Sequence, residues 1–235
     1  MRPSAGRVCT ICGEALINAY SGCTSDEEPR CGLCQRMQPL FAKAAAYGSY
    51  VGGLRELIHL LKYERVRPAA NVLGRMLAEA ITDLKPAFGD TRLLVVPVPL
   101  HARKLGQRGF NQAELITRAA LKLKPAGEQL GLNGAVLQRC RETQSGVDVP
   151  RQQRRQNMCG AFAVIKPGEV EGREVLLVDD VYATGATVSE CARVLRRAGA
   201  TRVWVATVAR TLRSDAAYAI TSEPEKARVA MAAHG

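Results

Sequence analysis

Two adjacent acids, Asp179 and Asp180, stand between an apolar run and a turn of small and hydroxylated residues. The run from Val175 to Val178 has the composition of a strand buried inside a parallel sheet. Open α/β sheets bind their ligands at the carboxyl ends of such strands. The turn over 182–187 leads into a helical pattern, so its amides, its hydroxyls and the positive helix end could hold an anion. The pattern therefore predicts a phosphate site with two acids beside it.

Two structural alternatives compete with this interpretation. Thr187 and Glu190 have the spacing of a capping box, which would make the threonine only a helix start. The adjacent acids could be ordinary turn residues after a strand. Neither alternative accounts for strand, acids, Thr-Gly turn and helix following one another without a gap. The common rival phosphate motifs, G-x-x-x-x-G-K-[ST] and a G-x-G-x-x-G that opens a helix, do not occur in the sequence.

A second segment carries candidate phosphate ligands. Leu93 to Val96 predict a buried strand, and the prolines that follow end it because they cannot donate to the ladder. The loop leaves the carboxyl edge of the sheet and carries several basic groups that can donate to phosphate oxygens. These groups are His101, Arg103 and Lys104, with Arg108 shortly after. A plain solvated turn is the alternative for this loop.

The amino-terminal segment holds two C-x-x-C pairs, Cys9 with Cys12 and Cys31 with Cys34. Two such pairs match the tetrahedral four-sulfur cage of structural zinc, which has no open position for chemistry. A segment this short cannot fold on apolar burial alone, so the metal would supply most of its folding free energy. A redox pair is the alternative, but neither pair has a strand-to-helix context. Cys23 is interpreted as a spare thiol that could replace a neighbouring ligand.

The composition is that of a globular protein with a proper core. The chain has 235 residues, is 47% hydrophobic and carries a formal charge of +11, which suits phosphorylated metabolites or nucleic acid. Its apolar runs all fall short of the roughly 20 residues that cross a bilayer, and the amino terminus lacks a signal-peptide core. We therefore expect a cytoplasmic protein with no membrane span.

The remaining pattern supplies the elements that must position these groups. Helices are expected over 53–63 and over 69–84, with Pro86 ending the second. Weakly extended structure is expected over 43–51 and a further buried strand over 202–208. Asn111 is the expected cap of another helix. We assign Trp204, Phe110 and Cys191 to the core and His59 to the surface.

The segment between Leu137 and Phe162 is polar and basic. It could form a mobile lid over the ligand, a solvated connection, or a nucleic-acid contact. Its arginines are Arg139, Arg141, Arg151, Arg154 and Arg155.

The residues over 175–187 resemble the phosphoribosyl pyrophosphate (PRPP) motif of type I phosphoribosyltransferases. The resemblance implies that Asp179 and Asp180 are the catalytic acids, which hydrogen-bond the ribose hydroxyls. It implies that PRPP is also bound by Val181, Ala183, Thr184, Gly185, Ala186 and Thr187. The proline segment is similar to the loop that holds pyrophosphate in amidophosphoribosyltransferases. The implied pyrophosphate loop comprises Pro97, Val98, Pro99, Leu100, His101, Arg103 and Lys104.

The run Arg-Gly-Phe-Asn-Gln-Ala over 108–113 narrows the resemblance to the ComF family, which is named for its role in bacterial competence. This family implies an α/β class: a parallel-sheet type I phosphoribosyltransferase fold with a small N-terminal zinc ribbon. We expect the ribbon over 1–39, the phosphoribosyltransferase-like domain over 40–212 and a C-terminal tail over 213–235.

The resemblance also implies the function. The protein would transfer the phosphoribosyl group from PRPP to an unidentified acceptor, with Mg²⁺ bridging the pyrophosphate and sugar hydroxyls. A cysteine knuckle stands where amidophosphoribosyltransferases carry a glutaminase domain, so we do not expect glutamine-derived ammonia as acceptor. The alternative is a non-catalytic cytoplasmic factor that handles single-stranded DNA together with the DNA-uptake machinery.

Overall fold

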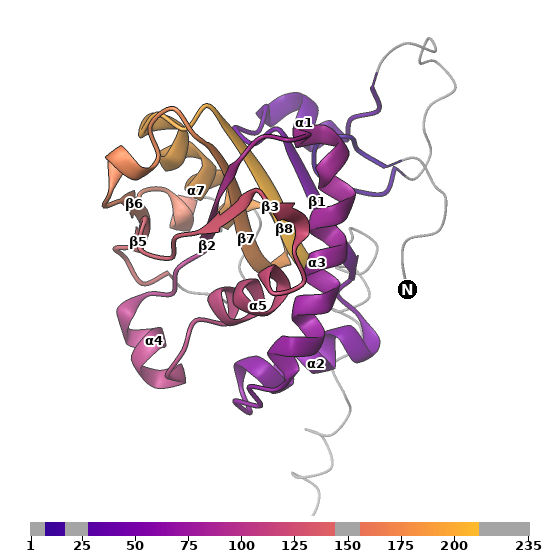
Figure 1. Ribbon diagram of the computed structural model, residues 1–235, viewed down its shortest axis with the longest axis vertical. Coiled ribbons are helices and arrows are strands. Elements are labelled where there is room, and N and C mark those ends of the chain that lie inside the picture. The colour runs from indigo at the N-terminus through magenta and orange to yellow at the C-terminus, as the bar shows by residue number, and fades with distance from the viewer. Residues whose placement is uncertain (1–7, 17–27, 144–155, 212–235) are drawn as a thin grey trace, which may run out of the picture.

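The computed structural model describes residues 8–16, 28–143 and 156–211. Its centre is a five-stranded parallel sheet in the order β1-β8-β7-β2-β4 (Figure 1). The strands are β1 Lys43–Ser49, β8 Arg202–Arg210, β7 Glu174–Tyr182, β2 Leu93–Pro97 and β4 Leu130–Leu132. This arrangement confirms the expected parallel α/β sheet and the strands predicted from apolar runs.

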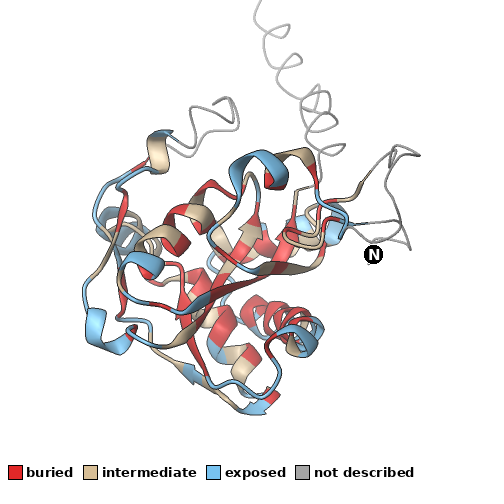
Figure 2. Cartoon of the chain, turned by 90° about the horizontal axis from the view of Figure 1, so that it is seen from above, coloured by how far each residue is buried: buried red, intermediate tan, exposed pale blue. Residues whose placement is uncertain are grey.

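Helices cover both faces of the sheet, so the apolar runs of the central strands are buried (Figure 2). Leu176 and Val178 face the layer that contains α2, α3 and α5. Val175 and Leu177 face the layer of α7 and the β5–β6 pair. The bounds are α2 Gly52–Lys62, α3 Ala69–Phe88, α5 Gln112–Leu121, α7 Ala186–Arg197, β5 Leu137–Arg139 and β6 Phe162–Val164. Continuous apolar runs are expected for strands packed on both faces.

The prediction that Pro86 ends the second helix is wrong, because α3 continues to Phe88 with the proline inside it. Proline removes one hydrogen bond from a helix interior. The last turn is nevertheless held by burial of Leu84 and Phe88, and Phe88 packs edge-on against Trp204 with ring centroids 6.1 Å apart. Tertiary packing therefore outweighs the local signal. Trp204 and Phe110 are buried as expected, and His59 is exposed.

The segment after β2 differs from the predicted loop, because a short helix, α4 Ala102–Arg108, follows the prolines. Asn111 caps α5 as expected, with its Oδ1 accepting a hydrogen bond from the Ala113 amide. The smaller elements are α1 Gly32–Met37, β3 Pro125–Glu128 and the 3₁₀ turn Pro167–Glu169.

The amino-terminal segment packs directly on the sheet. Its cysteines belong to the same buried cluster as Phe41 and Ala44, and the Ala44 amide donates to the Ile11 carbonyl at 2.6 Å. The sheet therefore completes the burial of this segment, and the boundary expected at residue 39 stays a prediction. Cys23, residues 144–155 of the basic segment, and the tail from 212 onward lie outside the described residues.

Candidate functional site

The acid pair lies within a strand and not in a turn. β7 continues through Asp179 and Asp180 to Tyr182, and it stays in register with β8, where Asp179 is opposite Thr207. The alternative that the acids are turn residues is therefore wrong. Neighbouring β2 ends where Pro97 pairs with Val178, so the acids stand one step beyond it at the carboxyl edge. This is the edge at which parallel sheets bind ligands.

Asp180 is 4% exposed and forms a buried ion pair with Lys62, the last residue of α2. The Lys62 ammonium lies 2.5 Å from the Asp180 carboxylate oxygen Oδ2. Burial opposes the charge of Lys62, but the attraction of Asp180 is sufficient for the pKa of Lys62 to be raised overall. Lys62 is therefore a charged member of the site that no motif in the sequence identified. The signal that exists is weak, because Lys62 only follows Ile58 and Leu61 at the buried end of an amphipathic helix.

Asp179 is half-buried and accepts a hydrogen bond from the Asp180 amide at 2.9 Å. Burial, followed by repulsion from the charge of Asp180, raises the pKa of Asp179 to about 8. The positive charge of Lys62 opposes this shift. A carboxyl with so high a pKa holds its proton at neutral pH, and a cation or a hydrogen-bond donor placed beside it would favour the ionised form. Perturbed carboxyls in such positions mark candidate functional sites.

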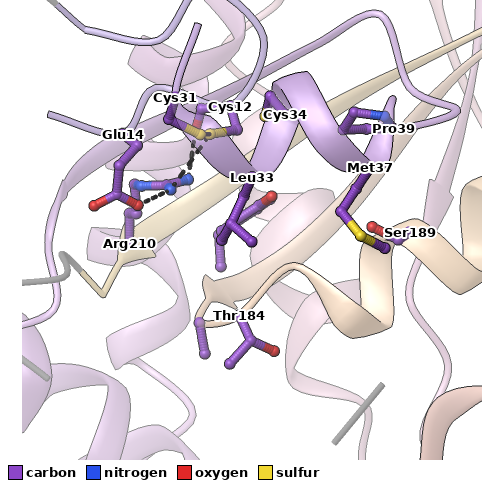
Figure 3. A pocket seen from close by; sticks show the side chains of 12 residues that line it. Cys12, Glu14, Cys31, Leu33, Cys34, Met37, Pro39, Thr184, Ser189 and Arg210 are labelled. Atoms are coloured by element: carbon purple, nitrogen blue, oxygen red, sulfur yellow. Dashed lines mark hydrogen bonds and ion pairs between the residues drawn. The ribbon is translucent and has the colours of Figure 1, made fainter. Parts of the chain in front are cut away.

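The turn after β7 leads into α7 through Gly185, which has φ of +76° and is the N-cap of the helix. The capping-box alternative is wrong: the N-cap is Gly185 and not Thr187, and the Glu190 carboxylate accepts hydrogen bonds from the Gly160 amide and Arg193. The first amides of α7 are thus held in the orientation that binds anions. Thr184 lines a pocket together with Leu33 and Met37 from the amino-terminal segment (Figure 3).

This turn contains the predicted phosphate residues, and the structure brings them together in one continuous bend. Ala183 is exposed and Thr184 and Thr187 are half-buried, whereas Gly185 and Ala186 are buried. The Thr184 hydroxyl accepts a weak hydrogen bond from the Ala186 amide at 3.4 Å. Val181 lies in β7, half-buried beside the helical layer of α2 and α3. We call residues 183–187 the phosphate loop below.

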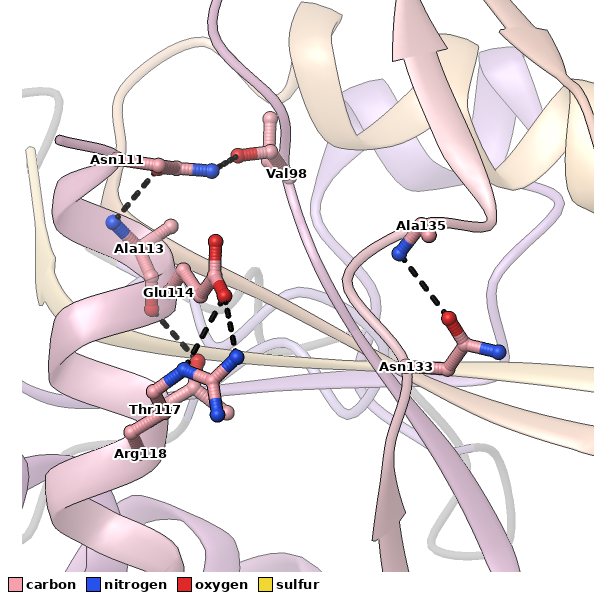
Figure 4. A network of polar contacts seen from close by, with 8 residues as sticks. All are labelled: Val98, Asn111, Ala113, Glu114, Thr117, Arg118, Asn133 and Ala135. Atoms are coloured by element: carbon pink, nitrogen blue, oxygen red, sulfur yellow. Dashed lines mark hydrogen bonds and ion pairs between the residues drawn. The ribbon is translucent and has the colours of Figure 1, made fainter.

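The proline segment runs beside the acids, as its position after β2 predicts. The Val98 amide donates to the Val178 carbonyl at 2.8 Å, and the Asn111 side chain donates to the Val98 carbonyl at 3.0 Å (Figure 4). Pro99 and Leu100 continue as half-buried loop residues to His101, the N-cap of α4. Asn111 therefore holds this loop and caps α5 with the same side chain.

The basic groups of the segment divide into two sets. Arg103 is largely exposed and its guanidinium lies 3.3 Å from the Glu142 carboxylate, so it forms an ion pair at the surface. Lys104 is half-buried, and burial, followed by the charge of Arg139, lowers its pKa. Arg108 and Lys62 contribute to the same lowering. We call the four basic side chains Lys62, Lys104, Arg108 and Arg139 the cationic cluster, because the charges of the other three all lower the pKa of Lys104.

Arg139 joins this cluster from β5. It is half-buried, forms a β-bridge with His101 and stacks over the Phe162 ring at 5.4 Å. Burial lowers the pKa of Arg139, while the nearby charge of Asp179 opposes that effect. The bridge to His101 places Arg139 beside the proline segment. The sequence placed Arg139 only in a polar stretch of undetermined role.

The four cysteines of the two C-x-x-C pairs are buried, and their sulfur atoms all lie within 4.8 Å of one another. Cys12 Sγ and Cys31 Sγ are 3.7 Å apart. A tetrahedral ion with Zn–S bonds of about 2.3 Å requires sulfurs about 3.8 Å apart, so this geometry fits a metal centre. A hydrogen bond from the Cys34 thiol lowers the pKa of Cys12 to about 5, with help from the charge of Arg210. Cys191, in contrast, is fully buried in the core as predicted.

The described residues include no helix with the length and apolar character needed to cross a membrane.

Comparison with known proteins gives a consistent set of relatives. A family model described as the phosphoribosyl transferase domain matches residues 111–222. The DNA utilization protein YhgH of Salmonella typhimurium is 30% identical over 214 residues, which cover 87% of this chain and 91% of that protein. Competence protein F of Haemophilus influenzae is 31% identical over 183 residues, covering 77% and 78%. Competence protein ComFC of Bacillus subtilis is 24% identical over 200 residues, covering 85% and 75%.

The cysteine cluster predicts one zinc ion per chain in protein purified without chelators. Replacing a ligand in Cys31→Ser removes one corner of the tetrahedron, so we expect loss of stoichiometric zinc by elemental analysis. The matched control is Cys140→Ser, because Cys140 is exposed and distant from the cluster. Full zinc content in Cys31→Ser would show that another thiol, such as Cys23, completes the site.

The raised pKa of Asp179 predicts a pH-dependent penalty on folding. An unperturbed aspartate has a pKa of about 3.9, so between about pH 4 and pH 8 the folded state keeps a proton that the unfolded chain releases. Rising pH therefore reduces the free energy of unfolding, by at most about 1.4 kcal/mol per pH unit. Asp179→Asn should gain stability relative to the unmodified protein from pH 5 to pH 8, in urea titrations without ligand. Asp83→Asn, at an exposed position of α3, should leave the pH profile unchanged. Parallel profiles for Asp179→Asn would contradict the assignment.

Proposed function

The chain belongs to the ComF family, and from that premise we propose that it binds PRPP and transfers the phosphoribosyl group to an acceptor with release of pyrophosphate. Its fold is the parallel-sheet α/β fold of type I phosphoribosyltransferases, with the cysteine cluster at the amino-terminal end. The observation that carries the proposal is the convergence of three features at one sheet edge. These are the acid pair, the phosphate loop and the cationic cluster.

Each feature has a role in this proposal. The phosphate loop and the start of α7 bind the 5′-phosphate through backbone amides and hydroxyls. Asp179 and Asp180 position the ribose hydroxyls and stabilise the positive charge that develops on the sugar ring. The cationic cluster receives the pyrophosphate, with Lys104 and Arg139 closest to His101 and the proline segment. Arg103 contributes to the field from the surface, where it is paired with Glu142.

The chemical step is a displacement at C1 of the ribose. The C1–oxygen bond to pyrophosphate breaks and its electron pair leaves with pyrophosphate, while the acceptor nucleophile forms the new bond to C1 and releases its proton. The acid pair would hold Mg²⁺ beside PRPP, and the ion would neutralise part of the charge of the leaving group. The cysteine cluster takes no part in this step, because a four-thiolate zinc centre has no open coordination position. We propose zinc as its occupant and the cytoplasm, where thiols stay reduced, as the location.

The acid pair gives the direct test of PRPP binding. Asp179→Asn combined with Asp180→Asn keeps the size of both side chains and removes both carboxylates, so calorimetry with Mg²⁺ and PRPP should detect no binding. Asp83→Asn, an exposed change of the same type, should bind as the unmodified protein does. Unchanged affinity in the double variant would refute the site assignment. If PRPP binds as proposed, a screen of pyrophosphate release across purines, pyrimidines and simple amines would identify the acceptor.

A second function is favoured by the relatives, which are named for DNA utilization and for competence. In this proposal the chain handles single-stranded DNA in the uptake machinery, and its formal charge of +11 provides the attraction for phosphates. The enzymatic and DNA-binding roles can coexist, because DNA would be attracted by the positive charge of the chain, whereas the enzymatic role depends on the acid pair, which does not attract nucleic acid.

The two roles differ in their response to salt and to the acid-pair variant. If DNA binding depends on basic side chains, its affinity should fall by orders of magnitude between about 50 and 200 mM salt. It should also survive the change of both acids to asparagine. Fluorescence anisotropy with a labelled single strand measures both effects. An absent or salt-insensitive interaction would remove the second function and leave the enzymatic proposal alone.

A further inference from the structure

Arg210, the last residue of β8, lies between the cysteine cluster and the phosphate loop and is only 6% exposed. On the cysteine side its guanidinium donates to the Cys12 carbonyl and to the Glu14 carboxylate, at 2.5 Å from Oε2. Its distance from Cys12 Sγ is 3.6 Å (Figure 3). Glu14 is itself buried, so the two charges form a buried ion pair. The amino-terminal segment is thus attached to β8 through this one side chain and the surrounding apolar contacts.

The other face of Arg210 is covered by an aromatic ring that reaches the phosphate loop. Its guanidinium carbon lies 4.4 Å from the centroid of Tyr182, the last residue of β7. A methyl group placed on Gly185 would lie only 2.4 Å from the Tyr182 hydroxyl oxygen. Tyr182 therefore fills the space beneath the loop, and its edge-to-face contact with Phe41, at 6.4 Å, fixes the ring from a further side. A path of successive contacts therefore links the cysteine cluster to the phosphate loop, in the order Cys12, Arg210, Tyr182 and Gly185.

This path depends electrostatically on the metal centre. Four thiolates around one divalent ion carry a net charge of −2, and a buried arginine requires nearby negative charge to offset its desolvation. The metal also fixes the turn that presents the Cys12 carbonyl, because Cys9 and Cys12 flank that turn. When the metal leaves, it no longer fixes the Cys12 carbonyl or holds the four thiolates together, and the Glu14 carboxylate stays as the charged partner of Arg210. Arg210 is then held less firmly over the Tyr182 ring, and the ring is held less firmly beneath Gly185.

We propose that Arg210 is a positioning residue that couples the cysteine-bound metal to the phosphate loop through Tyr182, so that metal occupancy sets the affinity of the loop for the 5′-phosphate. The identity of the ligand rests on the proposed function, whereas the coupling between metal and loop does not. Because coupling between two binding sites is reciprocal, PRPP must strengthen metal binding by the same factor as the metal strengthens PRPP binding. Typical coupling gives a change of about tenfold in each affinity.

The first experiment follows the loop without any ligand. Amide hydrogen exchange of residues 183–188 is compared between zinc-loaded protein and protein stripped with a chelator under reducing conditions. Stripping should accelerate exchange in the unmodified protein. In Arg210→Met the loop should exchange fast even with zinc bound, and stripping should add little. The exchange of β2 and of the first strand residues of β7 reports whether the sheet itself stays folded.

Arg202→Met is the matched control, because Arg202 begins the same strand and also stacks over an aromatic ring. It lies 5.5 Å from the Trp204 ring centroid and its side chain is 53% exposed. This variant should keep the zinc-dependent loop protection of the unmodified protein. Tyr182→Leu provides a second route if Arg210→Met does not fold. It leaves the Arg210 contacts with Cys12 and Glu14 in place, so zinc should stay bound while the loop loses its protection.

The second experiment measures the reciprocal effect on ligand and metal. Calorimetric affinity for PRPP should fall about tenfold on zinc removal in the unmodified protein and in Arg202→Met, but not in Arg210→Met. Zinc affinity, from competition with a coloured chelator, should rise about tenfold with saturating PRPP in the same two proteins. Loop exchange that is independent of zinc in folded, unmodified protein would overturn the coupling. Absence of PRPP binding to the zinc-loaded protein would instead refute the proposed function, while the exchange data would still decide the coupling.

Discussion

Burial of charge at the carboxyl edge of a parallel sheet is the constraint that organises this molecule. β7 is covered on both faces and carries two carboxylates near its end, so the structure must offset their desolvation. Lys62 does this for Asp180 at 2.5 Å, and α2 is fixed in place because Ile58 and Leu61 are completely buried. On the other face the desolvation of Asp179 is not offset in this way and its pKa is raised to about 8, although β5 of the β5–β6 pair carries the charge of Arg139 into the same region. α2 and the β5–β6 pair carry no sequence motif, yet they supply the cations near the two acids of β7.

The sequence predicted features whose causes are local. The apolar run before Asp179, the prolines after Val96 and the side chain of Asn111 act within a few residues of themselves, so pattern and capping rules identified them. The two C-x-x-C pairs have the same property, because ligand spacing on a tight turn is local. The buried strands of the parallel sheet followed from these signals. Two members of the cationic cluster, Lys62 and Arg139, did not, because they reach the site only through the tertiary fold.

Two of the wrong predictions have the same cause. Pro86 carries a strong local signal for a helix end, yet the packing of Phe88 against Trp204 stabilises a further turn. The segment after Pro99 has the composition of a solvated loop, yet α4 forms there, with Lys104 half-buried and Arg103 paired with Glu142. Thr187 and Glu190 have the right spacing for a capping box, but Glu190 is recruited by Gly160 and Arg193. Contacts between distant parts of the chain, Phe88 with Trp204 and Gly160 with Glu190, act in the first and the third of these cases.

The two acids, which have equal roles in the motif, have different surroundings. Neighbouring residues of a strand point to opposite faces, and here Asp180 faces Lys62 of α2 while Asp179 faces Arg139 and Cys191. Asp179 is also the more exposed of the two. A ribose that enters from the carboxyl edge would therefore meet Asp179 first. Asp180 would also hold Lys62, whose charge adds to the cluster that receives pyrophosphate. On this argument the acid pair serves both ends of the proposed reaction, because both carboxylates position the sugar and Asp180 in addition fixes a cation for the leaving group.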